Sequence, residues 1–259
     1  MLVKDLINKL DNHSPIDAAM DWDNVGLLVG DYDKEVKKIY IALDATDEVI
    51  EHAIDANADL LLTHHPLIFS GLKRITADHF IGRRIMKLIR HDISYVAFHT
   101  NFDVFGMGDV VAKRLELRDC VPLDVTYGDD EGIGRIGDAV TPVSLKQLAK
   151  DVKDKFDLSA VNVYGDTDKI MKRIAVCPGS GKSDIDNAVA GGADVLITGD
   201  IGHHDGIDSV AKGMAIIDAG HYGLEHLFID YMSEFLMGNN TVSDFEIYKE
   251  PIENPYTVI

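Results

Sequence analysis

Cysteine is scarce in this sequence, which contains Cys120 and Cys177 and no CxxC spacing. That scarcity argues against a disulfide framework and against a structural zinc cage built from thiolates. No run of about 18 apolar residues occurs, so the sequence contains no candidate membrane span. Residues 1–12 lack the apolar core of a signal peptide and have the spacing of an amphipathic helix, with Leu2, Leu6, Ile7 and Leu10 on one face. We therefore expect a cytoplasmic protein with reduced thiols.

Basic residues are also few relative to acidic ones. The chain has 25 Lys and Arg against 44 Asp and Glu, a formal net charge of −19. A broad nucleic-acid surface needs clustered cations to neutralise phosphates, so this balance argues against nucleic acid on the outer surface. Hydrophobic residues make up 46% of the 259 positions, which is enough to form the core of one large domain or two small ones.

Apolar, strand-like runs alternate with helix-like segments along most of the chain, and this rhythm predicts an α/β fold with mostly parallel strands in mixed sheets flanked by helices. The segment 124–142 is rich in Gly and Asp, and we expect it to be a turn-rich connection near a domain boundary. Strands are expected at 37–44, 59–64, 94–100, 135–140 and 161–166, with an edge strand at 244–251. Helices are expected at 46–58, 79–92, 108–117, 144–156 and 223–238.

A repeat is visible when residues 37–65 are set above residues 172–200. The offset of 135 is constant over 29 positions, and Asp59 meets Asp194 while Thr63 meets Thr198. Such a repeat indicates duplication of one supersecondary unit. His64 and His65 fall opposite a glycine and an aspartate, so the two imidazoles are an addition specific to the first copy.

Three expected strand ends carry side chains that bind metals: His64 with His65, His99 with Asp103, and His221 with Glu225. Carboxyl ends of parallel strands are where ligand sites form. Adjacent residues of an extended backbone point apart, so we expect His64 and His65 to diverge. His221 and Glu225 are spaced i, i+4 at a helix start and can converge.

Nitrogen and oxygen donors of this kind suit Zn, Mn, Fe, Co or Ni better than Ca. Each pair also has a plainer interpretation. The histidine pair could be polar surface, Asp103 could cap the helix that follows Gly106, and His221 with Glu225 could be an exposed pair.

The stretch 177–184, CPGSGKSD, follows a strand and precedes a helix. It is not a P-loop, because Val176 stands where that motif needs its first glycine. Gly179, Ser180 and Gly181 could contact an anionic substrate through backbone N–H groups, or could simply form a tight turn.

Four further residues near these strand ends are candidates for supporting roles. His99 could orient the carboxylate that follows it or relay protons, or it could be buried with one hydrogen bond. His203 and His204 could act as acid or base, or could lie on the surface at a helix cap. Asp44 points toward the same edge of the sheet. Trp22, by contrast, is expected to be a packing anchor rather than a substrate platform.

Five motifs, in this order, resemble those of the GTP cyclohydrolase type 2 homologue family, also called the NGG-one-interacting-factor-three-like family. The resemblance runs from about Asp21 to about Ile229 and matches the short form of the family. The motifs are WDNVGLLVG, LLLTHHPLIFSGLKRI, HTNFDVFGMGDVVAKRLEL, LITGDIGHHD and DAGHYGLEH.

The resemblance implies a dinuclear centre that holds two divalent transition-metal ions. Its implied ligands are His64, His65, Asp103, His221 and Glu225, with Glu225 as the bridge. It also implies two interlaced, duplicated α/β units, which we place at residues 1–125 with 221–259 and at residues 126–220. Members resemble toroidal homohexamers.

The implied activity is that of a dimetal-dependent hydrolase acting on a nucleotide-like substrate. The family name suggests opening of the imidazole ring of GTP with release of formate. The alternative is a non-catalytic toroid that handles metal or binds partners. One departure is that Asp200 stands where the family usually has Glu, which shortens that carboxylate by one methylene.

Overall fold

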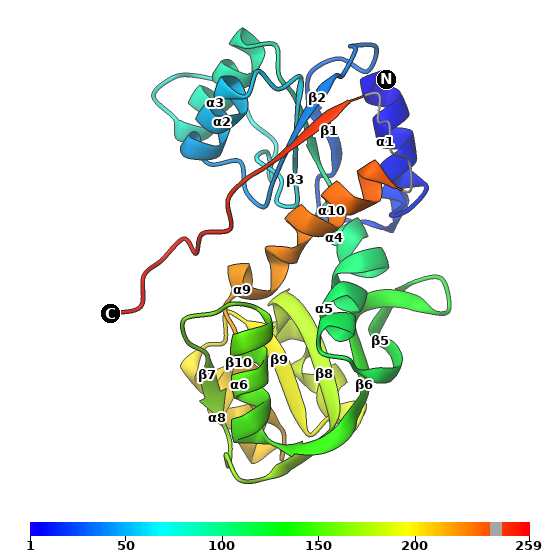
Figure 1. Ribbon diagram of the computed structural model, residues 1–259, viewed down its shortest axis with the longest axis vertical. Coiled ribbons are helices and arrows are strands. Elements are labelled where there is room, and N and C mark those ends of the chain that lie inside the picture. The colour runs from blue at the N-terminus through cyan, green and yellow to red at the C-terminus, as the bar shows by residue number, and fades with distance from the viewer. Residues whose placement is uncertain (239–244) are drawn as a thin grey trace. The chain divides into compact units, whose positions relative to one another are not determined.

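The computed structural model describes residues 1–238 and 245–259. The chain forms two compact units, one comprising Met1–Phe102 with Phe228–Ile252 and the other comprising Asp103–Leu227 with Glu253–Ile259. Figure 1 follows the chain through both units. Each unit contains one mixed sheet flanked by helices, so the α/β prediction is confirmed.

The first unit is built on a five-stranded sheet of order β1-β4-β3-β2-β11. Strands β4, β3, β2 and β11 are parallel neighbours, and β1 pairs antiparallel with β4 at one edge. The predicted edge strand is present as β11, while Asp244, the first residue of that prediction, lies outside the described residues. The strands are β1 (Gly26–Val29), β2 (Lys38–Ala42), β3 (Leu60–Thr63), β4 (Ser94–Ala97) and β11 (Glu246–Lys249).

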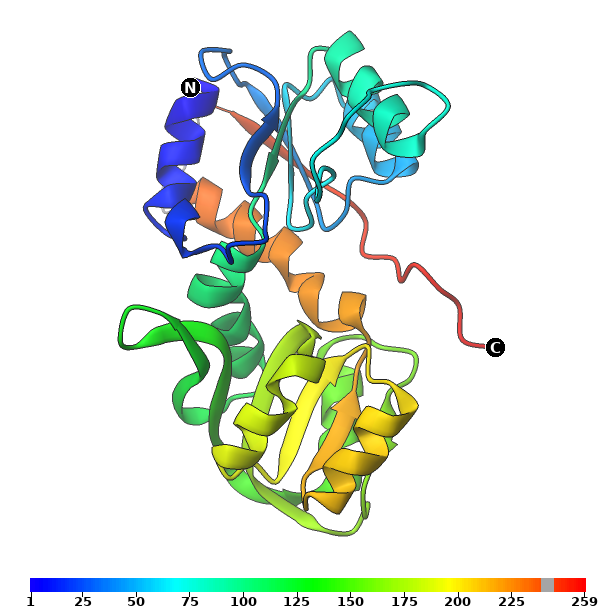
Figure 2. The same ribbon diagram turned by 180° about the vertical axis from the view of Figure 1, so that it is seen from behind.

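Helices cover both faces of this sheet. Helices α2 (Asp47–Asp55) and α3 (Phe80–Arg90) lie on one side, and α1 (Val3–Asp11) and α10 (Leu227–Met237) lie on the other (Figures 1 and 2). Alternate strand residues such as Tyr95 pack with α2 and α3 in one buried cluster, as the two-residue period of a strand requires. Helix α1 is amphipathic, as the sequence predicts.

The second unit is built on a six-stranded sheet of order β5-β6-β8-β9-β10-β7. Its three parallel strands β8, β9 and β10 are adjacent, and antiparallel strands extend the sheet on both sides. The strands are β5 (Arg118–Tyr127), β6 (Glu131–Ser144), β7 (Asn162–Tyr164), β8 (Ile170–Ser180), β9 (Val195–Gly199) and β10 (Ala215–Asp218).

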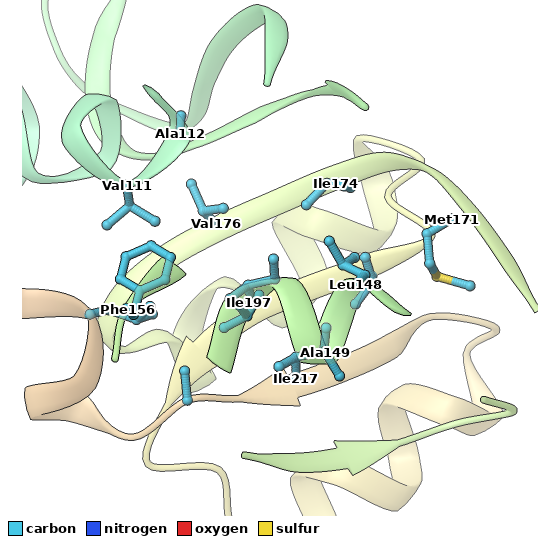
Figure 3. Packing of buried hydrophobic residues seen from close by; sticks show 14 of the residues in the cluster. Val111, Ala112, Leu148, Ala149, Phe156, Met171, Ile174, Val176, Ile197 and Ile217 are labelled. Carbon is cyan, nitrogen blue, oxygen red and sulfur yellow. The ribbon is translucent and has the colours of Figure 1, made fainter. Parts of the chain in front are cut away.

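One buried hydrophobic cluster lies on each face of this second sheet. On one face, α5 (Gly108–Arg114) and α6 (Leu145–Lys155) pack on the central strands (Figure 3). On the other face, α7 (Ile185–Ala190) packs against the alternate residues of the same strands. The remaining helices are α4 (Thr100–Phe102), α8 (His203–Ala211) and α9 (His221–Glu225), with short helical turns at Ile16–Ala18, Asp103–Met107 and Gly181–Asp184.

The prediction of a turn-rich connection at 124–142 is wrong. Strands β5 and β6 form an antiparallel hairpin there, and only residues 128–130 form the turn. The glycines that indicated loops belong to the strands: a Cβ at Gly132 would collide with the backbone carbonyl of Asp124. Glycine can mark a close approach of two backbones within a sheet as well as a turn.

The repeat is present at the level of single contacts. The side chain of Asp59 accepts hydrogen bonds from the N–H groups of Lys37 and Lys38, at 2.8 and 2.9 Å. Its counterpart Asp194, 135 residues later, accepts from the N–H groups of residues 172 and 173 at 2.8 and 3.0 Å. The strand registers of β2 with β3 and of β8 with β9 also match at this offset.

Both cysteines are free thiols. Across the part of the chain that the structure describes, no helix has both the length and the apolarity needed to cross a membrane.

Candidate metal centre

The histidine pair of the first unit follows β3 directly. The strand ends at Thr63, and His64 and His65 lie in a bend, where their ring centroids are 5.0 Å apart. The prediction that the two rings diverge is therefore wrong, because the alternation of an extended strand stops one residue before the pair.

Each ring of the pair is held through its Nδ1 atom. Nδ1 of the buried His64 lies 2.8 Å from the carbonyl oxygen of Phe98, and Nδ1 of His65 lies 2.8 Å from a carboxylate oxygen of Asp44. These contacts fix the ring orientations, so Nε2 is the atom that each imidazole would present to a metal ion. Asp44 therefore contacts a proposed metal ligand directly, which fits the supporting role expected for it.

A third imidazole joins the pair. His64, His65 and His99 each offer a ring nitrogen, and these three atoms lie within 4.8 Å of one another, so the group could hold a metal ion. The ring of His99 is oriented in the same way, with Nδ1 2.9 Å from a carboxylate oxygen of Asp23.

Asp23 was missed by the sequence analysis. Its side chain is fully buried and accepts hydrogen bonds from the N–H and hydroxyl groups of Thr100 as well as contacting His99. Burial by itself would raise the pKa of Asp23, but the hydrogen bonds from His99 and Thr100 outweigh it and hold the pKa at about 2. The available signal was the WDN segment, which contains Asp23 and heads the first family-like motif.

In the second unit, His221 and Glu225 share one face of α9, as their spacing predicts. Nε2 of His221 lies 2.9 Å from Oε2 of Glu225, whose side chain is only 4% exposed. Nδ1 of His221 lies 2.8 Å from Asp200, which holds the ring from the other side. The shorter side chain of Asp200 therefore still reaches the imidazole.

The glycine-rich stretch packs closely against this pair. Gly179 has φ +74°, and a Cβ there would lie 2.4 Å from Oε1 of Glu225 and 3.6 Å from Nε2 of His221. The N–H of Gly181 donates to the hydroxyl of Thr198 at 2.9 Å, and the exposed Ser180 ends β8. The missing side chain at Gly179 is what leaves room for the carboxylate.

Asp103 begins a π-helical turn, Asp103–Met107, that runs directly into α5. The alternative in which Asp103 caps that helix is wrong, because the chain is already helical before it. Such π-turns are frequent at functional sites. Burial raises the pKa of the Cys177 thiol, and the charges of Asp184, Asp103 and Glu225 raise it further. Carboxylate oxygens of Asp103 and Glu225 lie within 4.8 Å of each other.

Three other candidates lie at the surface. His203 and His204 form the exposed first turn of α8, with Gly202 as its N-cap, and their ring centroids are 5.2 Å apart. Trp22 is 58% exposed, so the prediction of a packing anchor is wrong. Its neighbours in the chain anchor the segment instead.

Each unit thus carries its own set of donors. The first unit brings together His64, His65 and His99, and the second unit brings His221 and Glu225 together near Asp103. All are imidazole or carboxylate donors, the types that transition-metal ions accept.

Known proteins resemble the chain over most of its length. Two curated proteins named GTP cyclohydrolase 1 type 2 homolog are similar, one from Clostridium perfringens (35% identical, 90% of each chain) and one from Clostridium acetobutylicum (37% identical, 91% of this chain and 90% of that one). The crystal structure of a Staphylococcus aureus hypothetical protein matches with TM-score 0.89 and 30% identity, covering 100% of this chain and 99% of that one. The profile of the Duf34/NIF3 (NGG1p interacting factor 3) family matches residues 1–255. The chain belongs to the Duf34/NIF3 family.

Proposed function

We propose that this protein is a dimetal-dependent hydrolase of a nucleotide-like substrate. The proposed ligands of the two divalent transition-metal ions are His64, His65, Asp103, His221 and Glu225. The observation that carries the proposal is the orientation of the imidazoles. His64, His65 and His221 are each held through Nδ1 by a carbonyl or carboxylate oxygen, which is the arrangement typical of histidines that bind metal through Nε2.

The donor chemistry of the second unit fits such a centre. Glu225 is a buried carboxylate whose two oxygens both have close neighbours: Oε2 faces the ring of His221, and Oε1 faces the bare backbone of Gly179. A buried carboxylate is costly without a positive partner, and a carboxylate with two oxygens can bridge two cations. These features support Glu225 as the bridging ligand.

A bound pair of divalent ions supplies Lewis acidity that makes water nucleophilic near neutral pH and stabilises developing negative charge. The chain's own residues supply orientation and proton transfer. Asp44 and Asp200 fix the rings of His65 and His221. Asp23 accepts from Nδ1 of His99, and this selects the tautomer whose Nε2 can take up a proton, so we assign the proton shuttle to His99.

For the substrate we propose GTP or a related nucleotide, since the similar curated proteins carry the name GTP cyclohydrolase 1 type 2 homolog. The reaction would be hydrolytic opening of the purine imidazole ring with release of formate. We also propose a toroidal homohexamer as the assembly, as the resemblance implies.

The test is formate release from GTP by protein loaded separately with Zn, Mn, Fe, Co or Ni. Glu225→Gln should lower the rate by more than the roughly 10- to 100-fold typical of losing an outer-shell partner of a metal. Glu48→Gln, at an exposed position of α2, is the matched control and should leave the rate unchanged. Metal binding without formate above the protein-free background would contradict the hydrolase and favour the non-catalytic, metal-handling alternative.

A further inference from the structure

An exposed aromatic pair lies beside the histidine cluster of the first unit. Trp22 is 58% exposed and Phe69 is 51% exposed, and their ring centroids are 5.7 Å apart with the ring planes tilted by 44°. The indole of Trp22 is also 6.1 Å from the ring of His99, at 71°. The aromatic pair thus borders directly on one of the imidazoles that could hold metal.

The backbone on both sides of the pair is tied down. Asp23, next to Trp22, is buried and bonded to His99 and Thr100 at the end of β4. Asn24 donates from its side-chain amide to the carbonyl of Ile68, the residue before Phe69. These polar anchors hold the two aromatic residues in place, although neither ring is buried by the fold.

We propose that Trp22 and Phe69 form an aromatic platform, on which the planar heteroaromatic ring of the substrate stacks beside the metal centre. This inference rests on the proposed function and deepens it, because it names the part of the substrate that the first unit recognises. A purine presents a flat π-face that stacks on indole whatever its pattern of hydrogen-bonding groups.

The platform lies next to the proposed proton shuttle. The ring of His99 neighbours both the indole and the pair of imidazoles, with its centroid 5.1 Å from that of His64 and 5.6 Å from that of His65. A ring stacked on Trp22 would lie close to His99, the residue to which we assign the proton shuttle.

The chain's own composition supplies the probe, because Trp22 is its single tryptophan. The emission of the metal-loaded protein should be quenched saturably by guanosine and by GTP. Inorganic tripolyphosphate, which has no ring, should leave the emission unchanged. Equal quenching by tripolyphosphate, or none by guanosine, would overturn the platform.

Variants separate stacking from structural effects. Trp22→Ala should weaken GTP binding, measured calorimetrically, by about 5- to 150-fold, the range for removing one aromatic ring that stacks a base. Trp22→Phe retains a π-face and should keep most of the affinity. Tyr32→Ala removes another aromatic side chain of the same unit, 54% exposed, and is the control expected to bind as the native protein does.

The outcomes distinguish this inference from the proposed function. Saturable quenching by guanosine without formate release would support the aromatic platform and contradict the hydrolase function. Formate release whose KM is unchanged in Trp22→Ala would keep the hydrolase and overturn the platform. A change of oligomeric state in Trp22→Ala, measured by sedimentation, with emission that depends on protein concentration, would assign the pair to a contact between copies and also overturn it.

Discussion

The two copies of the repeated βαβ unit share their backbone contacts and differ at the residues where the central strand ends. In both copies one aspartate, Asp59 or Asp194, accepts from two consecutive N–H groups at the start of the preceding strand. In both, the strand ends near a buried threonine, Thr63 or Thr198. The two copies therefore share the contacts that set strand register, whereas the residues that follow the strand ends differ between them.

After these threonines the copies diverge. The first copy continues with His64 and His65, two imidazoles held through Nδ1. The second continues with Gly199 and Asp200. A Cβ at Gly199 would lie 2.4 Å from the backbone nitrogen of His221, so the glycine lets α9 approach, and Asp200 orients the His221 ring. One copy thus provides candidate ligands, and the other provides space and support for ligands that come from α9.

The largest expected effect comes from making the first copy like the second. Replacing His64 and His65 by Gly and Asp should abolish metal binding, because it removes two proposed ligands. It should also lower the free energy of unfolding by about 2–4 kcal/mol, since the His64 ring is fully buried. Elemental analysis and urea unfolding measure the two effects. His91→Ala, at an exposed histidine of the same unit, is the control, and full metal content in the double variant would contradict the ligand assignment.

The shared framework is tested by paired substitutions. Asp59→Ala and Asp194→Ala should each lower the free energy of unfolding by about 1–3 kcal/mol, because each leaves two backbone N–H groups without their acceptor. Equal losses in chemical denaturation would support equivalent roles in the two copies. A loss at only one of the two positions would show that the contact has lost its structural role in the other copy.

A smaller and more local effect is expected at Gly179. Gly179→Ala and Gly192→Ala both place a side chain at φ +74°, at a cost of about 1–2 kcal/mol. A Cβ at Gly192 meets nothing within 4 Å, whereas one at Gly179 meets Glu225. A larger loss of stability in Gly179→Ala than in Gly192→Ala, with weaker metal binding only in Gly179→Ala, would support the proposed position of Glu225. Unchanged metal affinity in that variant would count against it.

The smallest effect concerns β11, which pairs parallel with β2 at the edge of the first sheet, whereas the equivalent neighbour of β8 is the antiparallel β6. Just after β11, Glu250 contacts His52 at 3.0 Å, and this hydrogen bond raises the pKa of His52, with Glu48 and Asp55 adding to the shift.

Because the pKa of His52 is raised in the folded state, its contact with Glu250 stabilises the fold fully below pH 6.5, the usual pKa of histidine. This stabilisation is lost as the pH rises through the raised pKa of the folded state. We expect the free energy of unfolding to fall by less than about 1 kcal/mol, the upper limit for an exposed ion pair. The loss should be visible as faster amide exchange in β11. His52→Ala should remove this pH dependence, and an unchanged dependence would assign it to another group.

Much of the fold could be predicted because periodicity and repetition are local. The strands β2, β3 and β4 and the helices between them lie within the expected ranges, and the offset of 135 anticipated matching registers. The hairpin of β5 and β6 could not be predicted from glycine content, because Gly132 is required by the close approach of a neighbouring strand. That requirement is a tertiary contact and leaves no periodic signal.

The sequence predicted some contacts of the candidate site and missed others. The spacing of His221 and Glu225 fixed their convergence, because i, i+4 residues share a helix face. The convergence of His64 and His65 could not be predicted, since it depends on where β3 ends. The support of His99 by Asp23 joins residues 76 positions apart, which no local pattern reports.

The metal content of the native protein, purified without chelator, tests the central claim most directly. The account predicts about two transition-metal ions per chain, as expected for a two-metal site, and a loss of both when Glu225 is replaced by Ala. An absence of bound metal, even after incubation with Zn, Mn, Fe, Co or Ni, would contradict the dinuclear centre and leave His64 and His65 with a packing role alone.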